Sequence, residues 1–132
     1  MATVALTLDD FEKTILDGGT VFVDFWAGWC GPCLQFAPNY EAASEANPDL
    51  VFAKVDTEDQ QQLAAAMNIT SIPTIMAFKE GIGVFAQAGA LPRAMLDDLI
   101  SQVRALDMDR VRADLARQET EQAMASSEAV EE

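Results

Sequence analysis

The stretch Val21-Phe22-Val23-Asp24-Phe25-Trp26 is followed two residues later by Trp29-Cys30-Gly31-Pro32-Cys33, and these two cysteines are the chain's only ones. The apolar run is typical of a strand buried on both faces. Two thiols three positions apart at the start of a helix lie on one face, one turn apart. That spacing lets them pass reversibly between dithiol and disulfide. The sequence therefore predicts a redox-active cysteine pair that directly follows a buried strand.

Two other uses of a cysteine pair are weaker. A structural disulfide that closes so short a loop would stabilise the fold by only roughly 2 kcal/mol before strain is subtracted. A closed zinc site needs four nitrogen or sulfur ligands. With no histidine and two cysteines, the chain cannot supply four such ligands alone, although two chains or added carboxylates could. We therefore expect no metal site, and disulfide exchange is favoured.

Length, charge and hydropathy restrict the protein class. A chain of 132 residues fits one domain with a substantial core, here followed by a tail. The formal net charge of -14 argues against nucleic acid or an anionic membrane as a partner. Neither an apolar run long enough to span a bilayer nor a basic start followed by an apolar segment is present. We expect a soluble, cytoplasmic protein that is a monomer.

Strand and helix patterns alternate along the chain. Thr7-Leu8-Asp9-Asp10 resembles a capping box, and Gly18-Gly19 ends the helix that follows it. Further helices are predicted from the cysteines to residue 46, over 59–67 and from about 92, where a proline suits the first turn. Strands are predicted at about 4–6, 20–26, 50–55, 74–79 and 82–86. This order predicts an α/β fold with parallel early strands and a late antiparallel hairpin.

Several separated motifs in one register resemble the thioredoxin family. Trp29 to Cys33 match its active-site sequence, and Asp24 and Lys54 match its buried aspartate and the lysine near it. Ile72-Pro73-Thr74 matches the segment that carries the family's cis-proline, and Gly89 and Pro38 also fall on family positions. The resemblance covers a domain of residues 1–104. It implies the thioredoxin fold, a central mixed sheet of four to five strands flanked by helices.

The two cysteines have different expected roles. Cys30 at the helix N-terminus would have its thiolate stabilised by free backbone N–H groups and the helix dipole, which makes it the attacking nucleophile. Cys33 lies one turn further in and is expected to be more buried and to resolve the mixed disulfide as a thiol. Gly31 lets the loop turn tightly, and Pro32 sets the first helical turn.

Asp24 and Lys54 are candidate proton-transfer groups. Burial is expected to raise the pKa of the Asp24 carboxyl, so that it can accept the proton of Cys33 as that thiol attacks. Lys54 on the neighbouring strand is expected to tune this equilibrium as a counter-charge. A purely structural ion pair, or a solvated lysine at a strand end, is the alternative for these two residues.

The resemblance also implies a substrate groove and partners. In the family, the cis Ile72–Pro73 bond faces the cysteines and offers backbone groups to an extended substrate, so Trp29, Ile72, Pro73 and Gly89 are expected to line a shallow apolar groove. The implied activity is reduction of disulfides in target proteins, with a thioredoxin reductase as electron donor. No cofactor is expected on this chain, since it has no Gly-x-Gly-x-x-Gly turn. The alternative is a scaffold or chaperone-like subunit in which redox activity is secondary.

Residues 105–132 form an extension beyond the family's usual end. Met108, Val111 and Leu115 recur at helical spacing, which predicts a helix over about 107–118. The acidic, serine-containing end is expected to be disordered. A helix laid on the domain is the simpler interpretation, and a partner-binding or dimerising helix is the alternative.

Overall fold

A central five-stranded sheet organises the computed structural model, which describes residues 2–130 and the side chains of residues 2–126. The strands are β1 (Thr3–Ala5), β2 (Thr20–Trp26), β3 (Val51–Asp56), β4 (Thr74–Lys79) and β5 (Ile82–Ala88), in the order β1-β3-β2-β4-β5. β3 is parallel to β1 and β2, whereas β4 is antiparallel to β2 and to β5. The sheet is therefore mixed, and the predicted late hairpin is confirmed.

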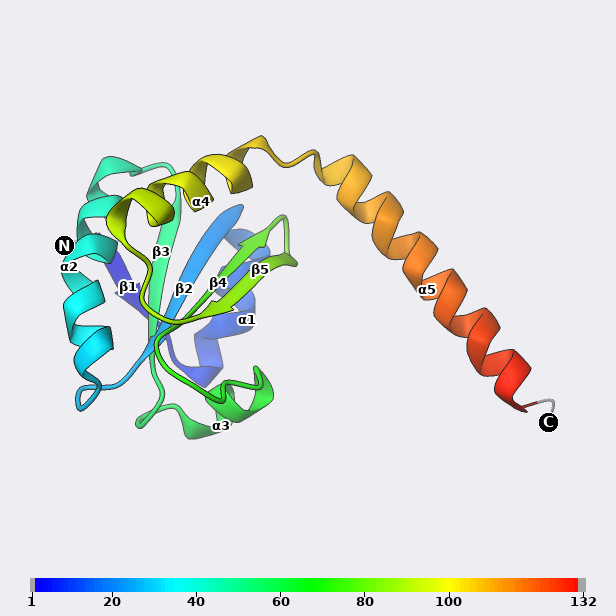
Figure 1. Cartoon of the computed structure of the whole chain (residues 1–132), viewed down its shortest axis with the longest axis horizontal. Helices are drawn as coiled ribbons and strands as arrows, with labels where there is room; N and C mark the ends of the chain where they lie inside the picture. The colour runs from blue at the N-terminus through cyan, green and yellow to red at the C-terminus, as the bar shows by residue number, and fades with distance from the viewer. Residues whose placement is uncertain (1, 131–132) are drawn as a thin grey trace.

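Helices cover both faces of this sheet (Figure 1). The covering helices are α1 (Leu8–Asp17), α2 (Gly31–Ala46), α3 (Gln61–Ala66) and α4 (Arg93–Ala105), and a fifth helix, α5 (Met108–Val130), projects from the domain. One core cluster joins α1 and α3 to one face of β2 and β3. The other joins α2 and α4 to the opposite face of the same strands and to β4. Because neighbouring residues of a strand point to opposite faces, β2 is buried on both sides, as its apolar sequence predicts.

The face toward α2 and α4 carries the residues that matter for the site. On β2 this face holds Phe22, then Asp24, then Trp26, because these residues alternate with those that face α1. Phe22 stacks on Phe52 of β3, with ring centroids 5.2 Å apart. Asp24 follows directly on this aromatic layer and is completely buried. The strand thus carries a carboxylate into the core beneath the helix that begins with the cysteines.

The loop between β2 and α2 brings the two cysteines to the first turn of a helix. Cys30 is the N-cap of α2, with an extended backbone, and Pro32 lies in the first turn. Proline tolerates this position because its missing N–H would have no partner inside the helix. Pro38 lies inside α2, which nevertheless continues to Ala46.

The last helix differs from the expectation. We predicted a helix ending near residue 118 and a disordered tail, whereas α5 continues to Val130. No glycine or proline follows Pro92, and alanine, glutamine and glutamate, which favour helices, dominate the end of α5. The expected helix end is therefore corrected, and the last two residues of the expected tail, Glu131 and Glu132, lie outside the described residues.

Candidate active site

Cys30 and Cys33 are joined in a disulfide at the N-terminus of α2. Their Cα atoms lie 5.2 Å apart, a separation that suits a disulfide bridge. The Cys33 backbone N–H donates to Cys30 Sγ at 3.2 Å, so this sulfur occupies the capping position of the helix. An anionic sulfur there would be stabilised by the free N–H groups and the positive end of the helix dipole. Both cysteines are buried as whole residues, and the expected contrast between them is small.

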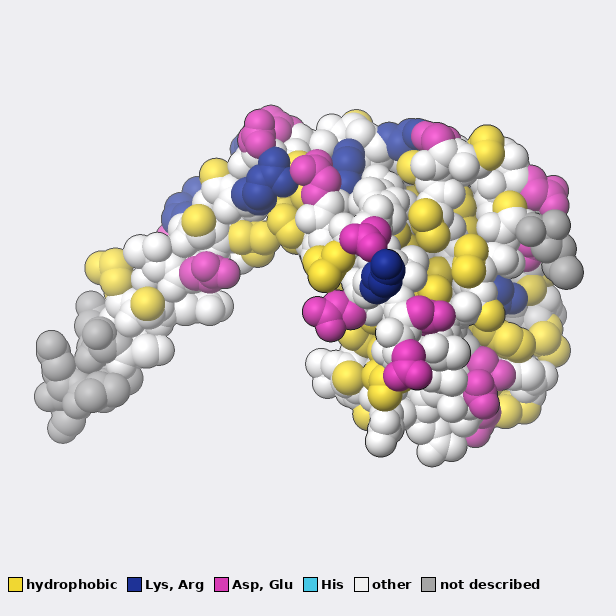
Figure 2. Space-filling model, turned by 180° about the vertical axis from the view of Figure 1, so that it is seen from behind, with side chains coloured by type: hydrophobic (Ala, Val, Ile, Leu, Met, Phe, Trp, Pro, Cys, Tyr) yellow, Lys and Arg dark blue, Asp and Glu magenta, His cyan; other side chains and the backbone are white. Residues whose placement is uncertain are grey.

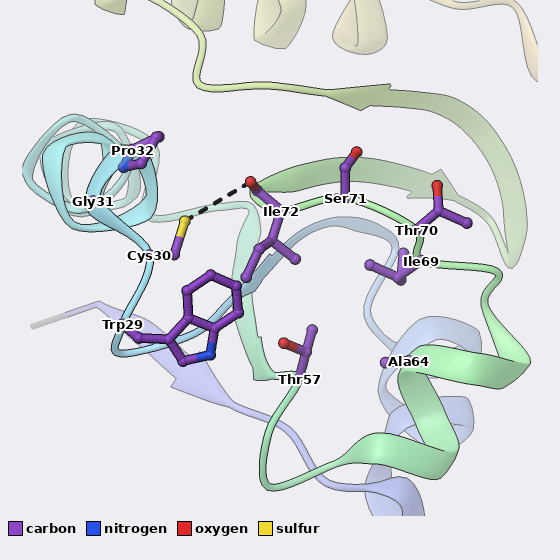
Figure 3. Close-up of a pocket in the computed structure, with 10 residues that line it drawn as sticks. All are labelled: Trp29, Cys30, Gly31, Pro32, Thr57, Ala64, Ile69, Thr70, Ser71 and Ile72. Atoms are coloured by element: carbon purple, nitrogen blue, oxygen red, sulfur yellow. Dashed lines mark hydrogen bonds between the residues drawn. The ribbon is translucent and has the colours of Figure 1, made fainter.

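A groove of about 420 Å³ opens beside Cys30. It brings together five residues that the sequence marked, and five that it did not (Figure 3). The marked residues are Trp29, Cys30, Gly31, Pro32 and Ile72, and the others are Thr57, Ala64, Ile69, Thr70 and Ser71. The second group comes from α3, the turn after β3 and the segment before Pro73. No spacing in the sequence places these residues beside the cysteines, because only the fold brings them there.

The Cys30 sulfur faces the wall of the groove formed by Ile72. Its Sγ lies 3.8 Å from the Ile72 backbone oxygen, as Figure 3 shows. The peptide bond between Ile72 and Pro73 is cis, as the resemblance implied. The Ile72 backbone therefore lies next to the sulfur.

Pro73 and Gly89, which we expected in the groove, do not line it. Pro73 is fully buried, and Gly89 is exposed. They contact each other instead, because the Gly89 N–H donates to the Pro73 oxygen at 2.8 Å. Gly89 has a φ of 105°, a conformation that glycine adopts without strain. These two residues hold the segment that carries Ile72 in place.

Trp29 is an exposed aromatic side chain at the edge of the groove. It is 70% exposed, and its indole N–H donates to Glu58 Oε1 at 2.7 Å. The hydrogen bond fixes the ring beside Cys30. This partner could not be predicted from the sequence, because Glu58 lies in the turn after β3 and only the sheet brings it close to Trp29.

Asp24 carries a completely buried carboxyl group. Neither of its carboxylate oxygens has a hydrogen-bond partner among the described residues. Burial raises the pKa of Asp24 to about 7, and the positive charge of Lys54 opposes this rise. The group can therefore gain or lose a proton near neutral pH, as the sequence predicted from its position in a buried strand.

Lys54 is paired with Asp24 in the register of β2 and β3. Its ammonium nitrogen nevertheless lies over the indole ring of Trp26, 4.6 Å from the ring centroid. Tyr40 of α2 is also close to Asp24, since the carboxylate contributes to the rise in the pKa of Tyr40 that burial causes. The Tyr40 hydroxyl donates to the Ala53 backbone oxygen at 2.7 Å. Asp24 is thus surrounded by groups that do not bond to it.

The described residues contain no group of three or more histidine, cysteine or acidic side chains arranged to hold a metal ion. In the same part of the chain, no helix is long and apolar enough to cross a membrane. The reactive group at the groove is the Cys30–Cys33 disulfide, which can exchange with external thiols and disulfides. Such exchange defines the class of thiol-disulfide oxidoreductases.

The comparisons with known proteins agree with this class. The family model described as thioredoxin matches residues 2–102, so the chain belongs to the thioredoxin family. A putative thioredoxin 2 of Streptomyces coelicolor is 58% identical over 120 residues, which are 91% of this chain and 90% of the relative. The chain is accordingly a protein-disulfide reductase whose redox centre is a disulfide.

Two solved structures support the fold. A mutant thioredoxin from Halobacterium salinarum superposes with a TM-score of 0.74 at 30% identity and covers 80% of this chain and 93% of its own. The thioredoxin of Plasmodium falciparum superposes with a TM-score of 0.70 at 37% identity, with 75% of this chain and 97% of its own covered. The expected fold is thereby confirmed.

Proposed function

We propose that Cys30 is the nucleophile and Cys33 the resolving thiol in the reduction of target-protein disulfides. The observation that carries the proposal is the position of Cys30 Sγ, which caps α2 and faces the groove beside Ile72. The Cys30 thiolate attacks one sulfur of the target, so that a mixed disulfide forms and a target thiolate leaves. Cys33 then attacks Cys30, which forms the internal disulfide and releases the second target sulfur as a thiolate. Two electrons pass from the cysteine pair to the target.

Asp24 accepts the proton that Cys33 must lose. A group with a pKa of about 7 is suited to this role near neutral pH. Its two oxygens are buried and accept no hydrogen bond from the described residues. Lys54 modulates this step through its charge, because a nearby ammonium group favours the ionised carboxylate.

The groove beside Cys30 binds the target segment. Its lining, with Trp29 on one side and Ile72 on the other, suits an extended peptide with an apolar side chain next to its cysteine. Gly31 and Pro32 form its edge along α2, and Pro73 and Gly89 support it from behind. A thioredoxin reductase returns the oxidised chain to the dithiol. We propose that the chain acts as a monomer in the cytoplasm and binds no further cofactor.

Trapping of the mixed disulfide tests the order of attack. A Cys33→Ser chain lacks the resolving thiol, so it should accumulate a covalent complex with a protein disulfide such as that of insulin. Mass spectrometry of the digested complex should locate the bond on Cys30. The matched Cys30→Ser chain should accumulate no complex, and a bond found on Cys33 would reverse the two roles.

A further inference from the structure

The position of Lys54 relative to Asp24 is the unexpected feature of the buried site. The two residues are register partners on adjacent parallel strands and point to the same face of the sheet. Opposite charges so placed would ordinarily pair. Yet neither oxygen of Asp24 has a partner among the described residues, and the Lys54 ammonium lies 4.6 Å from the centroid of the Trp26 ring. The lysine side chain is therefore directed along β2 to the next residue of this face.

An indole ring holds a cation differently from a carboxylate. The negative face of the ring attracts the ammonium group without adding a titratable charge. A direct ion pair with Asp24 would instead favour the ionised carboxylate and lower its proton affinity. The place of the ammonium group thus decides whether the buried carboxyl can take up a proton at neutral pH.

The other charged and titratable groups around Asp24 do not take over the effect of Lys54 on its proton affinity. On α2, the Tyr40 hydroxyl is committed to Ala53, and Cys30 and Cys33 form the disulfide. Glu41, also on α2, acts electrostatically with Lys54, but its carboxylate accepts hydrogen bonds from Thr3 and the Ala2 N–H. On β3, Asp56 pairs in register with Trp26 rather than with Asp24. From β4 the register partner is the apolar Ile75, and α4 contributes to this core the apolar side chains Leu96, Leu99, Ile100 and Val103.

We propose that Trp26 is a positioning residue for the reaction: its indole ring holds the Lys54 ammonium group away from the Asp24 carboxylate, which keeps that carboxyl free to accept a proton. The proposal rests on the proposed role of Asp24 as the acceptor of the Cys33 proton. Trp26 also packs against the cluster of Ala27, Cys30 and Cys33. A test must therefore separate its effect through Lys54 from its effect on packing.

The experiment measures the pKa of Asp24 directly, from the pH dependence of its carboxyl carbon chemical shift in oxidised protein labelled with 13C-aspartate. In the Trp26→Leu chain the ammonium group loses the ring and can approach the carboxylate. The pKa of Asp24 should then fall by about one pH unit, since an opposite charge at contact distance has at least this effect. The Trp26→Phe chain keeps a weaker aromatic face and should show a smaller fall.

The same Trp26→Leu change in a Lys54→Met chain is the matched control. Without the ammonium group, loss of the ring should leave the pKa of Asp24 unchanged. If Trp26→Leu lowered the pKa of Asp24 equally with and without the Lys54→Met change, Trp26 would act by excluding water. If Trp26→Leu did not lower this pKa in the chain that keeps Lys54, the ring would not hold the ammonium group away from Asp24. Either result overturns the proposal.

If the leucine variants do not fold, the unchanged chain still decides the question. The ε-methylene protons of Lys54 should show a strong upfield ring-current shift in the unchanged chain. This shift should be smaller in the Trp26→Phe chain. Lys54 protons at ordinary positions in the unchanged chain would overturn the proposal. Failure of the proposed function can be told apart from failure of this proposal. If an Asp24→Asn chain reduced insulin at an unchanged rate between about pH 6 and pH 8, Asp24 would not be the proton acceptor. The comparison of Asp24 pKa values would still report where the Lys54 ammonium group lies.

Discussion

Asp24 couples the stability of the fold to pH, because its carboxyl has a different proton affinity in the folded and unfolded chain. Burial raises its pKa from 3.8 to about 7 on folding. Below about pH 3 the group is protonated in both states and costs the fold nothing. As the pH rises toward 7, the unfolded chain releases its proton more readily, so stability falls with pH in this window. The full penalty above pH 7 is roughly 4 kcal/mol.

We therefore expect the Asp24→Asn chain to gain stability relative to the unchanged chain as the pH rises. The difference in the free energy of unfolding between the two chains should grow by a few kcal/mol between about pH 4 and pH 8. Urea denaturation of both oxidised chains at these two pH values measures it. Asp9→Asn, a change at an exposed carboxylate, is the matched control. A difference that is the same at both pH values would mean that Asp24 titrates as an ordinary carboxyl.

The sequence predicts the identity of the site residues better than their contacts. Cys30 and Cys33 follow from spacing alone, and Asp24 stands out because it interrupts an apolar strand. The position of the Lys54 ammonium over Trp26 could not be predicted. A lysine side chain has many rotamers, and the ring and carboxylate that compete for it meet only when the strands pair.

At the scale of helices and strands, the prediction succeeds where a local pattern is strong. β2 and β4 have the bounds predicted, since apolar runs end at turn residues. β5 extends two residues beyond the prediction, to Ala88, because its ladder with β4 continues there. The part of the groove wall from Ile69 to Ser71 could not be foreseen, because this segment has no periodic pattern and is placed by the elements around it.

Lys79 stabilises the C-terminus of α4 from the end of β4. Its ammonium group donates to the backbone oxygens of Val103, Arg104 and Leu106, at 2.8, 2.9 and 3.3 Å. The last carbonyl groups of a helix have no partner within it and carry the negative end of its dipole. One lysine therefore satisfies the helix end and ties it to the sheet.

We expect the Lys79→Met chain to lose about 1 to 3 kcal/mol of stability, since a hydrogen bond to a charged group contributes more to stability than one between neutral groups. Methionine keeps the apolar stem, so the loss reports the ammonium group. Lys13→Met is the matched control: Lys13 is exposed and, among the described residues, pairs only with Asp17 at 3.7 Å, an interaction worth less than about 0.5 kcal/mol. Urea denaturation measures both. Equal losses of stability in the two chains would show that the contacts of Lys79 contribute no more than the surface ion pair of Lys13.

The whole molecule consists of a domain and a projecting helix. Figure 1 shows α5 leaving the domain from the end of α4, whereas the loop before α2 and the short α3, which border the groove, lie at the opposite end of the sheet. Met108 is buried, and Arg112 pairs with Glu80 at 2.9 Å. Beyond Leu115 the described side chains of α5 are exposed. Among the described side chains of α5, burial is thus confined to the first two turns.

Charge is unevenly distributed over this helix. Basic side chains gather where α5 leaves the domain, whereas acidic ones are scattered over the same face of the molecule (Figure 2). Three of the eight basic residues, Arg110, Arg112 and Arg117, lie in the first half of α5. The relative from Streptomyces coelicolor matches 120 residues, more than the domain contains, so its match reaches into the extension. The extension is therefore not peculiar to this chain.

We expect a chain that ends at Leu106 to fold and to reduce disulfides at a rate close to that of the full chain. The residues assigned to the chemistry lie between Asp24 and Gly89, and none of the described side chains of α5 lines the groove. Loss of Met108 should cost at most roughly 3 kcal/mol, so the melting temperature should fall while the fold persists. Insulin reduction driven by dithiothreitol, and separately by a thioredoxin reductase, measures the activity, and circular dichroism verifies the fold. If the folded, truncated chain reduced insulin slowly with both reductants, α5 would act on the groove. If it reduced insulin slowly only with the reductase, α5 would recruit that enzyme.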